Sequence, residues 1–246
     1  AQLELAPAPQ LRVVAGLRYD AMGYDYATSL EPTQAGSHRR PADTSVDYSH
    51  VSPKLGVTYM FGTALNVFAS YGHGFRAPSE SQLFRQGRAL SSLDLKPVIA
   101  DNVEFGASGR IADRVSYELA AYHMRKTDDL LGFTRADGST ETVNAGETLH
   151  RGVEAGVTVA LPADLRLSVA GTLARHTFEE WTPRAGTDFA GKLMDGAPER
   201  MGSVSLNWLP SWRAGTFVGV EMQHIGPYWM DADNSHRYDG HTLVSI

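Results

Sequence analysis

The two ends of the predicted sheet differ in construction, and this constrains the fold more than any other sequence feature. Four tight turns each join two runs of alternating apolar and polar residues, at 60–63, 112–114, 162–164 and 210–213. They lie roughly 50 residues apart, whereas a β-sandwich spaces its turns about 8–12 residues apart. Between the hairpins run long polar connections, at 27–45, 72–100, 127–147, 180–197 and 226–240. Short turns at one end and long loops at the other are expected of a barrel in an outer membrane.

Alternation with a period of two marks the strands. Val115, Tyr117 and Leu119 share one face, while Ser116 and Glu118 lie on the other. This period fits a strand and not a helix. The same pattern predicts about ten strands, near 11–26, 46–60, 65–71, 102–110, 115–122, 153–159, 166–179, 201–209, 215–224 and 241–246.

The apolar face of these strands carries aromatic residues at both ends, as membrane interfaces require. They are Tyr59, Phe61, Tyr117 and Trp208 beside the tight turns, and Tyr19 and Tyr71 near the opposite rim. A soluble antiparallel sheet with one wet face also alternates, so a soluble β-sandwich that binds ligands at its surface stays open as an alternative. A passive porin shares both the alternation and the aromatic girdles, and it is the other alternative.

Composition removes several classes of function. The 246 residues carry a net charge of −6, and their Lys and Arg residues are scattered, so nothing indicates a partner nucleic acid. The absence of cysteine excludes thiolate metal sites, disulfides and cysteine nucleophiles. No stretch of 18 or more apolar residues is present, which leaves strands as the only candidate membrane-crossing elements. The start lacks a signal-peptide pattern and the end falls within an expected strand, so we expect a piece of a longer chain.

Motifs for enzymatic chemistry are weak or missing. Residues 72–77 match G-x-G-x-x-A, but Pro78 stands where the helix of a dinucleotide site would continue. We expect these glycines to relieve crowding where the chain leaves the sheet. The histidines form no HExxH motif, and Asp231, Asp233 and Asp239 lack the Gly and Glu of an EF-hand loop. The sequence therefore predicts no enzyme, no cofactor and no metal site.

An ordered set of short elements carries a more specific signal. It comprises Ser-Pro-Lys at 52–54, the run Tyr-Gly-His-Gly-Phe-Arg-Ala-Pro at 71–78, Leu-Lys-Pro at 95–97 and Asn-Val-Glu-Phe-Gly at 102–106. Further on come Asn-Ala-Gly at 144–146 and Arg-Gly-Val-Glu at 151–154. In this order they resemble the barrel of TonB-dependent outer-membrane receptors, over most of the chain.

The resemblance implies an all-β fold, an antiparallel transmembrane β-barrel of roughly 22 strands with a plugged lumen. We expect residues 1–246 to be an incomplete C-terminal portion of about ten strands, with the plug, the early strands and the closing strands lying outside it. Residues such as Val169 would face lipid and Lys54 or Glu154 the lumen. The implied location is the outer membrane of a Gram-negative bacterium, and the implied partners are TonB, outer-membrane lipid and lipopolysaccharide.

The implied function is capture and TonB-driven import of a scarce nutrient. Haem receptors of the family carry a histidine between the Phe-Arg-Ala-Pro box and a following Asn-Pro-Asn-Leu box. This chain has Ser-Leu-Asp-Leu at 92–95 in place of the second box, and no histidine lies between the two boxes. An anionic ferric siderophore suits arginine with aromatic stacking, so we favour that ligand. The candidate ligand-binding residues are His73, Arg76, Arg85, Arg88, Trp181, Arg184, Tyr228 and Trp229. Loop aromatics also pack loops together, and Arg76 and Pro78 also suit a structural role at the strand end.

Overall fold

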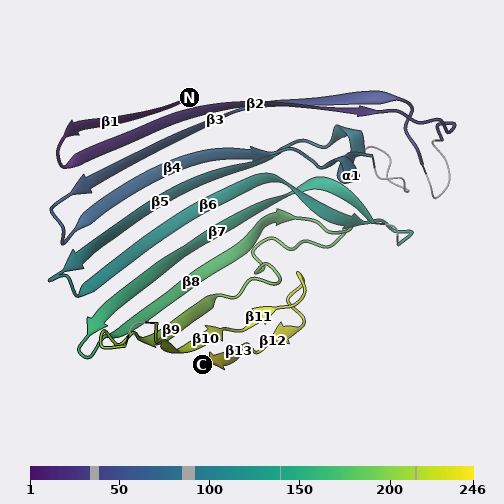
Figure 1. Ribbon diagram of the computed structural model, residues 1–246. Helices are drawn as coiled ribbons and strands as arrows, with labels where there is room; N and C mark the ends of the chain where they lie inside the picture. The colour runs from purple at the N-terminus through teal and green to yellow at the C-terminus, as the bar shows by residue number, and fades with distance from the viewer. Residues whose placement is uncertain (34–38, 85–91, 139, 214) are drawn as a thin grey trace.

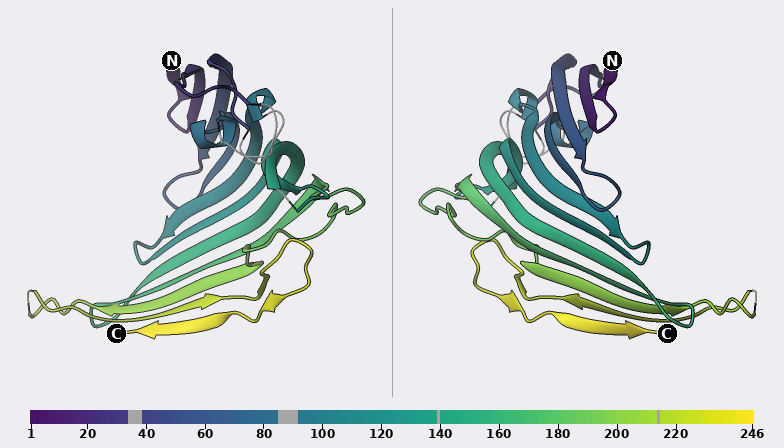
Figure 2. Two further views of the ribbon diagram at one scale, coloured as in Figure 1. Left: turned by 90° about the vertical axis from the view of Figure 1, so that its right-hand side faces the viewer. Right: turned by 90° about the vertical axis from the view of Figure 1, so that its left-hand side faces the viewer.

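The chain forms one curved sheet of eleven antiparallel strands that follow one another in sequence order (Figures 1 and 2). The computed structural model describes residues 1–33, 39–84, 92–138, 140–213 and 215–246. The strands of the sheet are β1 (Gln2–Ala8), β2 (Leu11–Tyr26), β3 (Thr44–Met60), β4 (Asn66–Arg76), β5 (Val98–Ile111), β6 (Val115–Thr134), β7 (Thr140–Leu161), β8 (Leu165–Trp181), β9 (Arg200–Trp208), β10 (Val218–Ile225) and β13 (His241–Ser245). The first and last strands of this order do not pair with each other.

Four minor elements lie in the long connections. A helical turn α1 (Glu80–Leu83) and a 3-10 turn η1 (Ser92–Asp94) lie between β4 and β5. The short strands β11 (Tyr228–Trp229) and β12 (Arg237–Tyr238) pair with each other between β10 and β13. Among the described residues, no helix is long and apolar enough to span a membrane.

The sheet is a single layer, and one of its faces is apolar and exposed. Phe105, Leu173 and Val169 are 60%, 61% and 44% exposed although they lie within strands. Apart from glycine and proline, the described apolar residues that are buried number only six, Leu83, Leu95, Val98, Ala120, Ala174 and Phe178. A β-sandwich buries its apolar faces between two packed sheets. The described residues form no second layer of that kind, so the soluble-sandwich alternative does not fit this chain.

The predicted hairpins are present, with the tight turns at one end and the long connections at the other (Figure 1). Ala112 and Asp113 have φ values of 48° and 53°, and Ala163 and Asp164 both have φ of 60°. Two consecutive positive φ values characterise the mirror-image turn whose twist matches that of paired strands. The last predicted turn is held by the Arg213 amide, which donates to the Pro210 carbonyl at 3.1 Å, within a longer connection between β9 and β10.

The structure corrects three expectations. Strand β1 was not predicted; it pairs with β2 through a register shift between Leu5 and Ala8, which accommodates Pro7. The expected loop at 127–147 is mostly strand, because a bulge between Lys126 and Asp129 lets β6 and β7 continue pairing. Crowding does not explain the glycines at 72 and 74, since a Cβ at either position would meet no atom within 4 Å.

Candidate ligand-binding rim and cleft

Towards the long connections, the apolar face of the sheet ends at one row of paired residues. On β7 and β8, Val153 pairs with Leu173, and both are exposed. The next residues outward on the same face are charged, because Arg151 pairs with Arg175 and with His123 of β6. A membrane-crossing strand needs about 9–11 residues, which the segment from the tight turns to this row supplies. We call everything beyond this row, on the side of the long connections, the outer rim.

The connection 182–199 extends the sheet where β9 has not yet begun. The Phe178 amide donates to the Lys192 carbonyl at 3.0 Å, and the Met194 amide donates to the His176 carbonyl at 2.9 Å. This segment therefore occupies the edge of β8 beyond the pairing of Leu173 with Arg200. The backbone groups of β8 are thereby satisfied outside the membrane zone.

The side chain of Asn234 joins the connection 226–240 to the connection 182–199 by hydrogen bonds. Its side-chain oxygen accepts from the Leu193 amide at 3.0 Å, and its side-chain nitrogen donates to the Leu193 carbonyl at 2.8 Å. The Gly196 amide donates to the Trp229 carbonyl at 2.8 Å. Two loops that are separate in sequence thus form one hydrogen-bonded unit at the outer rim.

The described ends of the connection between β4 and β5, 77–84 and 92–97, are held by three polar side chains of neighbouring strands. Tyr24 donates to the carbonyl of fully buried Pro78 at 3.0 Å, and Tyr48 donates to the Leu95 carbonyl at 2.7 Å. Asn144 accepts from the Lys96 amide at 2.6 Å and donates to the Lys96 carbonyl at 2.9 Å. Pro78 and Asn144 therefore serve as structural anchors of this loop.

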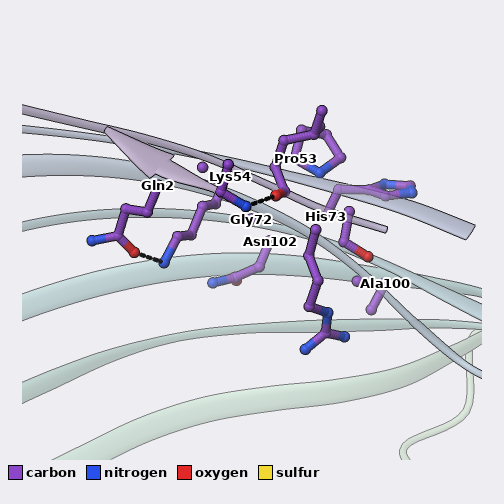
Figure 3. A pocket seen from close by; sticks show the side chains of 13 residues that line it. Gln2, Pro53, Lys54, Gly72, His73, Ala100 and Asn102 are labelled. Atoms are coloured by element: carbon purple, nitrogen blue, oxygen red, sulfur yellow. Dashed lines mark hydrogen bonds between the residues drawn. The ribbon is translucent and has the colours of Figure 1, made fainter. Parts of the chain in front are cut away.

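Three of the short sequence elements, those at 52–54, 71–78 and 102–106, contribute to the lining of one cleft of about 690 Å³. Figure 3 shows Lys54 reaching Gln2, to which its ammonium donates at 2.7 Å, with His73 and Asn102 nearby. Within the described part of the chain, the hydroxyl of Ser52 finds no hydrogen-bond partner, although the residue is only 9% exposed. The whole lining consists of Ala1, Gln2, Gly16, Leu17, Arg18, Ser52, Pro53, Lys54, Gly72, His73, Gly74, Ala100 and Asn102.

His73 belongs to a chain of hydrogen bonds beside this cleft. Its Nδ1 lies 2.7 Å from Asp101 Oδ1, and its Nε2 lies 2.8 Å from Nε2 of His50. Tyr71 donates to the same carboxylate oxygen at 2.6 Å. The Tyr71 hydroxyl and then the imidazole of His73 hold the pKa of Asp101 below its usual range, although partial burial opposes them. Asp101 is therefore the anionic end of this chain.

A second histidine pair lies at the outer rim between β7 and β8. Nδ1 of His150 lies 2.8 Å from Nδ1 of His176, and Nε2 of His150 lies 3.0 Å from the hydroxyl of fully buried Thr148. His150 is 8% exposed, and burial lowers its pKa to about 4. Burial also lowers the pKa of His176. This pair is thus neutral at physiological pH.

The candidates on β4 have different surroundings. His73 lines the cleft. Arg76 lies 3.8 Å from the carboxylate of Asp129, which is 6% exposed and also lies 3.5 Å from the ammonium of Lys126. A buried carboxylate requires such partners, which agrees with a structural role for Arg76. Arg85 and Arg88 lie outside the described residues.

The candidates at the other side of the rim are mostly engaged in packing. Trp181 packs against Phe178 and Phe189, with ring centroids 4.5 and 5.2 Å apart. Arg184 is exposed, and its Nε donates to the hydroxyl of Thr187 at 3.0 Å. The ring of Tyr228 lies 5.1 Å from that of Tyr238, and the guanidinium of Arg237 lies 5.9 Å from the ring of Trp229. The alternative that loop aromatics pack loops thus accounts for these contacts.

The described candidates fall into two groups and do not form one cluster. His73 and Arg76 lie on β4, whereas Trp181, Arg184, Tyr228 and Trp229 lie at β8 and beyond. Four strand steps of about 4.8 Å separate β4 from β8, which amounts to about 19 Å. Any ligand that contacts both groups must span that distance.

Sequence reasoning missed several residues of this region. His50, Asp101 and the pair His150–His176 were not singled out, and neither was Asn234. Cross-strand register is the signal that could have found the second pair, since His150 pairs directly with His176. Among the described residues, no group of three or more His, Cys, Asp or Glu side chains is arranged to hold a metal ion.

Over residues 1–246 the chain matches the family model described as "TonB dependent receptor-like, beta-barrel". Similar solved structures include the ferric yersiniabactin uptake receptor FyuA from Yersinia pestis (17% identity, TM-score 0.72) and the copper transporter OprC (17%, 0.76). Each alignment covers 99% of this chain but 36% and 39%, respectively, of those chains.

The ferric-catecholate import receptor Fiu from E. coli K12 is also similar, at 18% identity and a TM-score of 0.70 over 98% of this chain and 36% of that one. The chain therefore spans little more than a third of the length of these structures. At such identities the likeness shows the fold, and the family model shows the membership. This chain belongs to the TonB-dependent receptors, a family of outer-membrane transporters and not enzymes, and it forms part of their β-barrel.

Proposed function

We propose that this chain is part of the wall and outer rim of a receptor that binds an anionic metal chelate, most specifically a ferric siderophore, and imports it. The outer rim supplies the binding surface. In the intact receptor, TonB supplies the energy, and outer-membrane lipid and lipopolysaccharide surround the apolar band. Two of the similar structures are a ferric yersiniabactin uptake receptor and a ferric-catecholate import receptor, which agrees with this ligand class.

The observation that carries the proposal is the joining of loops 182–199 and 226–240 into one unit. The joined loops carry an exposed arginine, Arg184, and the aromatic residue Trp229, and they adjoin Trp181, whose ring packs on Phe189. A guanidinium recognises carboxylate and similar anions through paired donors, and aromatic rings stack on planar chelating groups. A preformed surface of this kind binds with a smaller ordering cost than separate flexible loops.

The test uses the intact receptor purified in detergent. Its binding of a ferric catecholate, a ferric hydroxamate and ferric citrate is measured by quenching of tryptophan fluorescence. We expect at least one of these chelates to bind, and we expect R184A combined with R85A and R88A to weaken that binding at least tenfold. Loss of charge-assisted hydrogen bonds, each contributing about 1.5–3 kcal/mol, accounts for an effect of this size.

The matched control is R114A, which removes an exposed arginine from a tight turn at the opposite end of the wall. Barrel assembly of every variant is followed by heat-modifiable migration in gels. Affinity that stays unchanged in an assembled R85A/R88A/R184A variant would refute the proposed site. Loss of binding in the R114A control as well would show that the effect is not specific to the rim.

A further inference from the structure

Two arginines lie side by side on the apolar face of the sheet, at the edge of the outer rim. Arg151 of β7 pairs directly with Arg175 of β8, and both residues are exposed. Each lies two residues from the exposed pair Val153–Leu173, so the arginines share the face of that pair. Directly paired residues hold their Cβ atoms about 4.5–5.5 Å apart, and like charges in such a pair are destabilising. This pair is therefore unfavourable unless an anion lies against it.

The described part of the chain supplies no such anion. Within it, the side chains of Arg151 and Arg175 form neither an ion pair nor a hydrogen bond. Arg125 of the neighbouring strand β6 differs, because it forms an ion pair with Glu147. The two paired arginines thus keep their full charge and all their donors for a group from outside the chain.

Two further basic residues extend this surface along the boundary of the apolar face. His123 of β6 pairs with Arg151, and Arg200 of β9 pairs with Leu173, diagonally next to Arg175. Both are exposed. The side chain of Arg200 lies over Gly226, where a Cβ would come within 2.4 Å of its Cγ, so this glycine leaves room for it. The basic surface therefore runs across four neighbouring strands.

The residues on the side of the tight turns are apolar. Val153 and Leu173 are exposed, and the next row on the same face is the exposed pair Val157–Val169. An occupant that fits both parts of this surface is anionic where it meets the arginines and apolar below them. Inorganic phosphate would satisfy only the arginines and would leave the apolar rows uncovered.

We propose that Arg151 and Arg175 bind a phosphate group of a phosphorylated glycolipid, whose acyl chains lie along the apolar rows. Guanidinium groups bind phosphate through paired, charge-assisted hydrogen bonds. A zwitterionic phospholipid fits less well, because its own ammonium group already lies beside its phosphate. The inference rests on one part of the proposed function, that lipid surrounds the apolar band, and it is independent of the ligand that the rim captures.

The experiment measures binding of three probes to the intact receptor in detergent by native mass spectrometry. Diphosphoryl lipid A carries phosphates and acyl chains, phosphatidylethanolamine is zwitterionic, and glucosamine 1-phosphate has the phosphate and the sugar without acyl chains. We expect lipid A to bind at least about tenfold more tightly than either of the others. R151A and R175A should each weaken lipid A binding about fivefold, the usual effect of one basic residue at an anionic lipid surface, and R151A/R175A at least about tenfold.

The matched control is R166A, which removes an exposed arginine from the same strand, β8, near its tight turn and on the other face by alternation. This variant should bind lipid A as the native receptor does. R151K/R175K keeps both charges but loses the paired donors, so its affinity should lie between those of the native receptor and R151A/R175A. Assembly is checked by heat-modifiable migration, and R151Q/R175Q replaces a double alanine variant that fails to assemble.

Unchanged lipid A affinity in the assembled double variant would overturn the inference. Equal affinity for phosphatidylethanolamine would also overturn it, since apolar contact alone would then explain the binding. Equal affinity for glucosamine 1-phosphate would show a site for the phosphate alone. The same variants should bind ferric chelates normally, so loss of chelate binding and loss of lipid binding distinguish the rim proposal from this one.

Discussion

At the scale of single residues, the pair His150–His176 makes the outer rim sensitive to pH. Burial lowers the pKa of His150 to about 4, and the charges of Lys126 and His176 act in the same direction, while Asp129 opposes them. An exposed histidine titrates near 6.5. The opened state therefore binds a proton at a higher pH than the packed state. The stability contributed by this residue is complete above about pH 6.5 and is lost as the pH falls towards 4.

We therefore expect acidification from pH 7 to pH 4.5 to loosen the top of β7 and β8. The packed rim should lose about 2–3 kcal/mol of local stability, since each unit of pKa difference corresponds to 1.36 kcal/mol. Hydrogen exchange of the amides near His150 and Phe178, corrected for the pH dependence of the intrinsic rate, measures this loss. H150Q removes the titrating group, so its local stability should change much less over the same range. Equal acid sensitivity in H150Q would contradict the assignment.

At the scale of elements, alternation predicted most of the strands correctly because the side-chain period of a strand is written directly in the sequence. The expectation of a loop at 127–147 was wrong, because β6 and β7 continue to pair beyond a bulge in which Asp128 takes a φ of 55°. The anchors Asn144 and Asn234 act on residues 48 and 41 positions away in the chain. No local pattern encodes such contacts. The described site residues were accordingly identified singly, and their two separate groups appear only in the fold.

The tight turns allow a prediction about hairpin stability. Ala112 has a φ of 48°, a conformation that costs an ordinary side chain about 1–2 kcal/mol and that asparagine adopts more readily. We expect A112N to stabilise the intact receptor by roughly 0.5–1 kcal/mol. A163N should do the same, because Ala163 has a φ of 60° in the equivalent position of the next hairpin. Urea midpoints of refolding into lipid vesicles measure the effect, and destabilisation by both variants would contradict this view of the turns.

The joining of the two loops by Asn234 also yields a prediction. N234G removes two hydrogen bonds to Leu193 while keeping a residue that tolerates the φ of 58° at this position. We expect a local destabilisation of about 1–3 kcal/mol, at 0.5–1.5 kcal/mol for each hydrogen bond. Hydrogen exchange at Leu193 and Met194 measures it. N234D keeps the acceptor for the Leu193 amide, so its local stability should lie between those of N234G and the native protein. If the protection of the Leu193 amide is unchanged in N234G, other contacts hold the two loops together.

At the scale of the whole molecule, the wall derives its stability from strand pairing and from its surroundings rather than from a core of its own. Apart from glycine and proline, its described residues bury six apolar side chains, while strand residues such as Phe105, Val169 and Leu173 display apolar side chains on an exposed face. An exposed apolar surface of this extent is stable only against lipid or another apolar partner. The opposite face carries the polar cleft and the charged residues. This agrees with the prediction from alternation that one face of the sheet contacts lipid and the other the lumen.

Two adjacent residues of β8 provide a direct test of which face of the sheet contacts lipid. Val169 pairs with Val157 and Val204 on the apolar face, whereas Ala170 pairs with Gly156 and Ser203 and so points to the other side. An arginine on the lipid face near mid-bilayer costs about 2–4 kcal/mol, while a lumen-facing one remains hydrated. We expect V169R in the intact receptor to lower the temperature at which heat-modifiable migration is lost, and A170R to lower it much less. If A170R is the more damaging of the two, the sheet presents its faces to lipid and lumen in the reverse sense, and the cleft beside His73 faces the membrane.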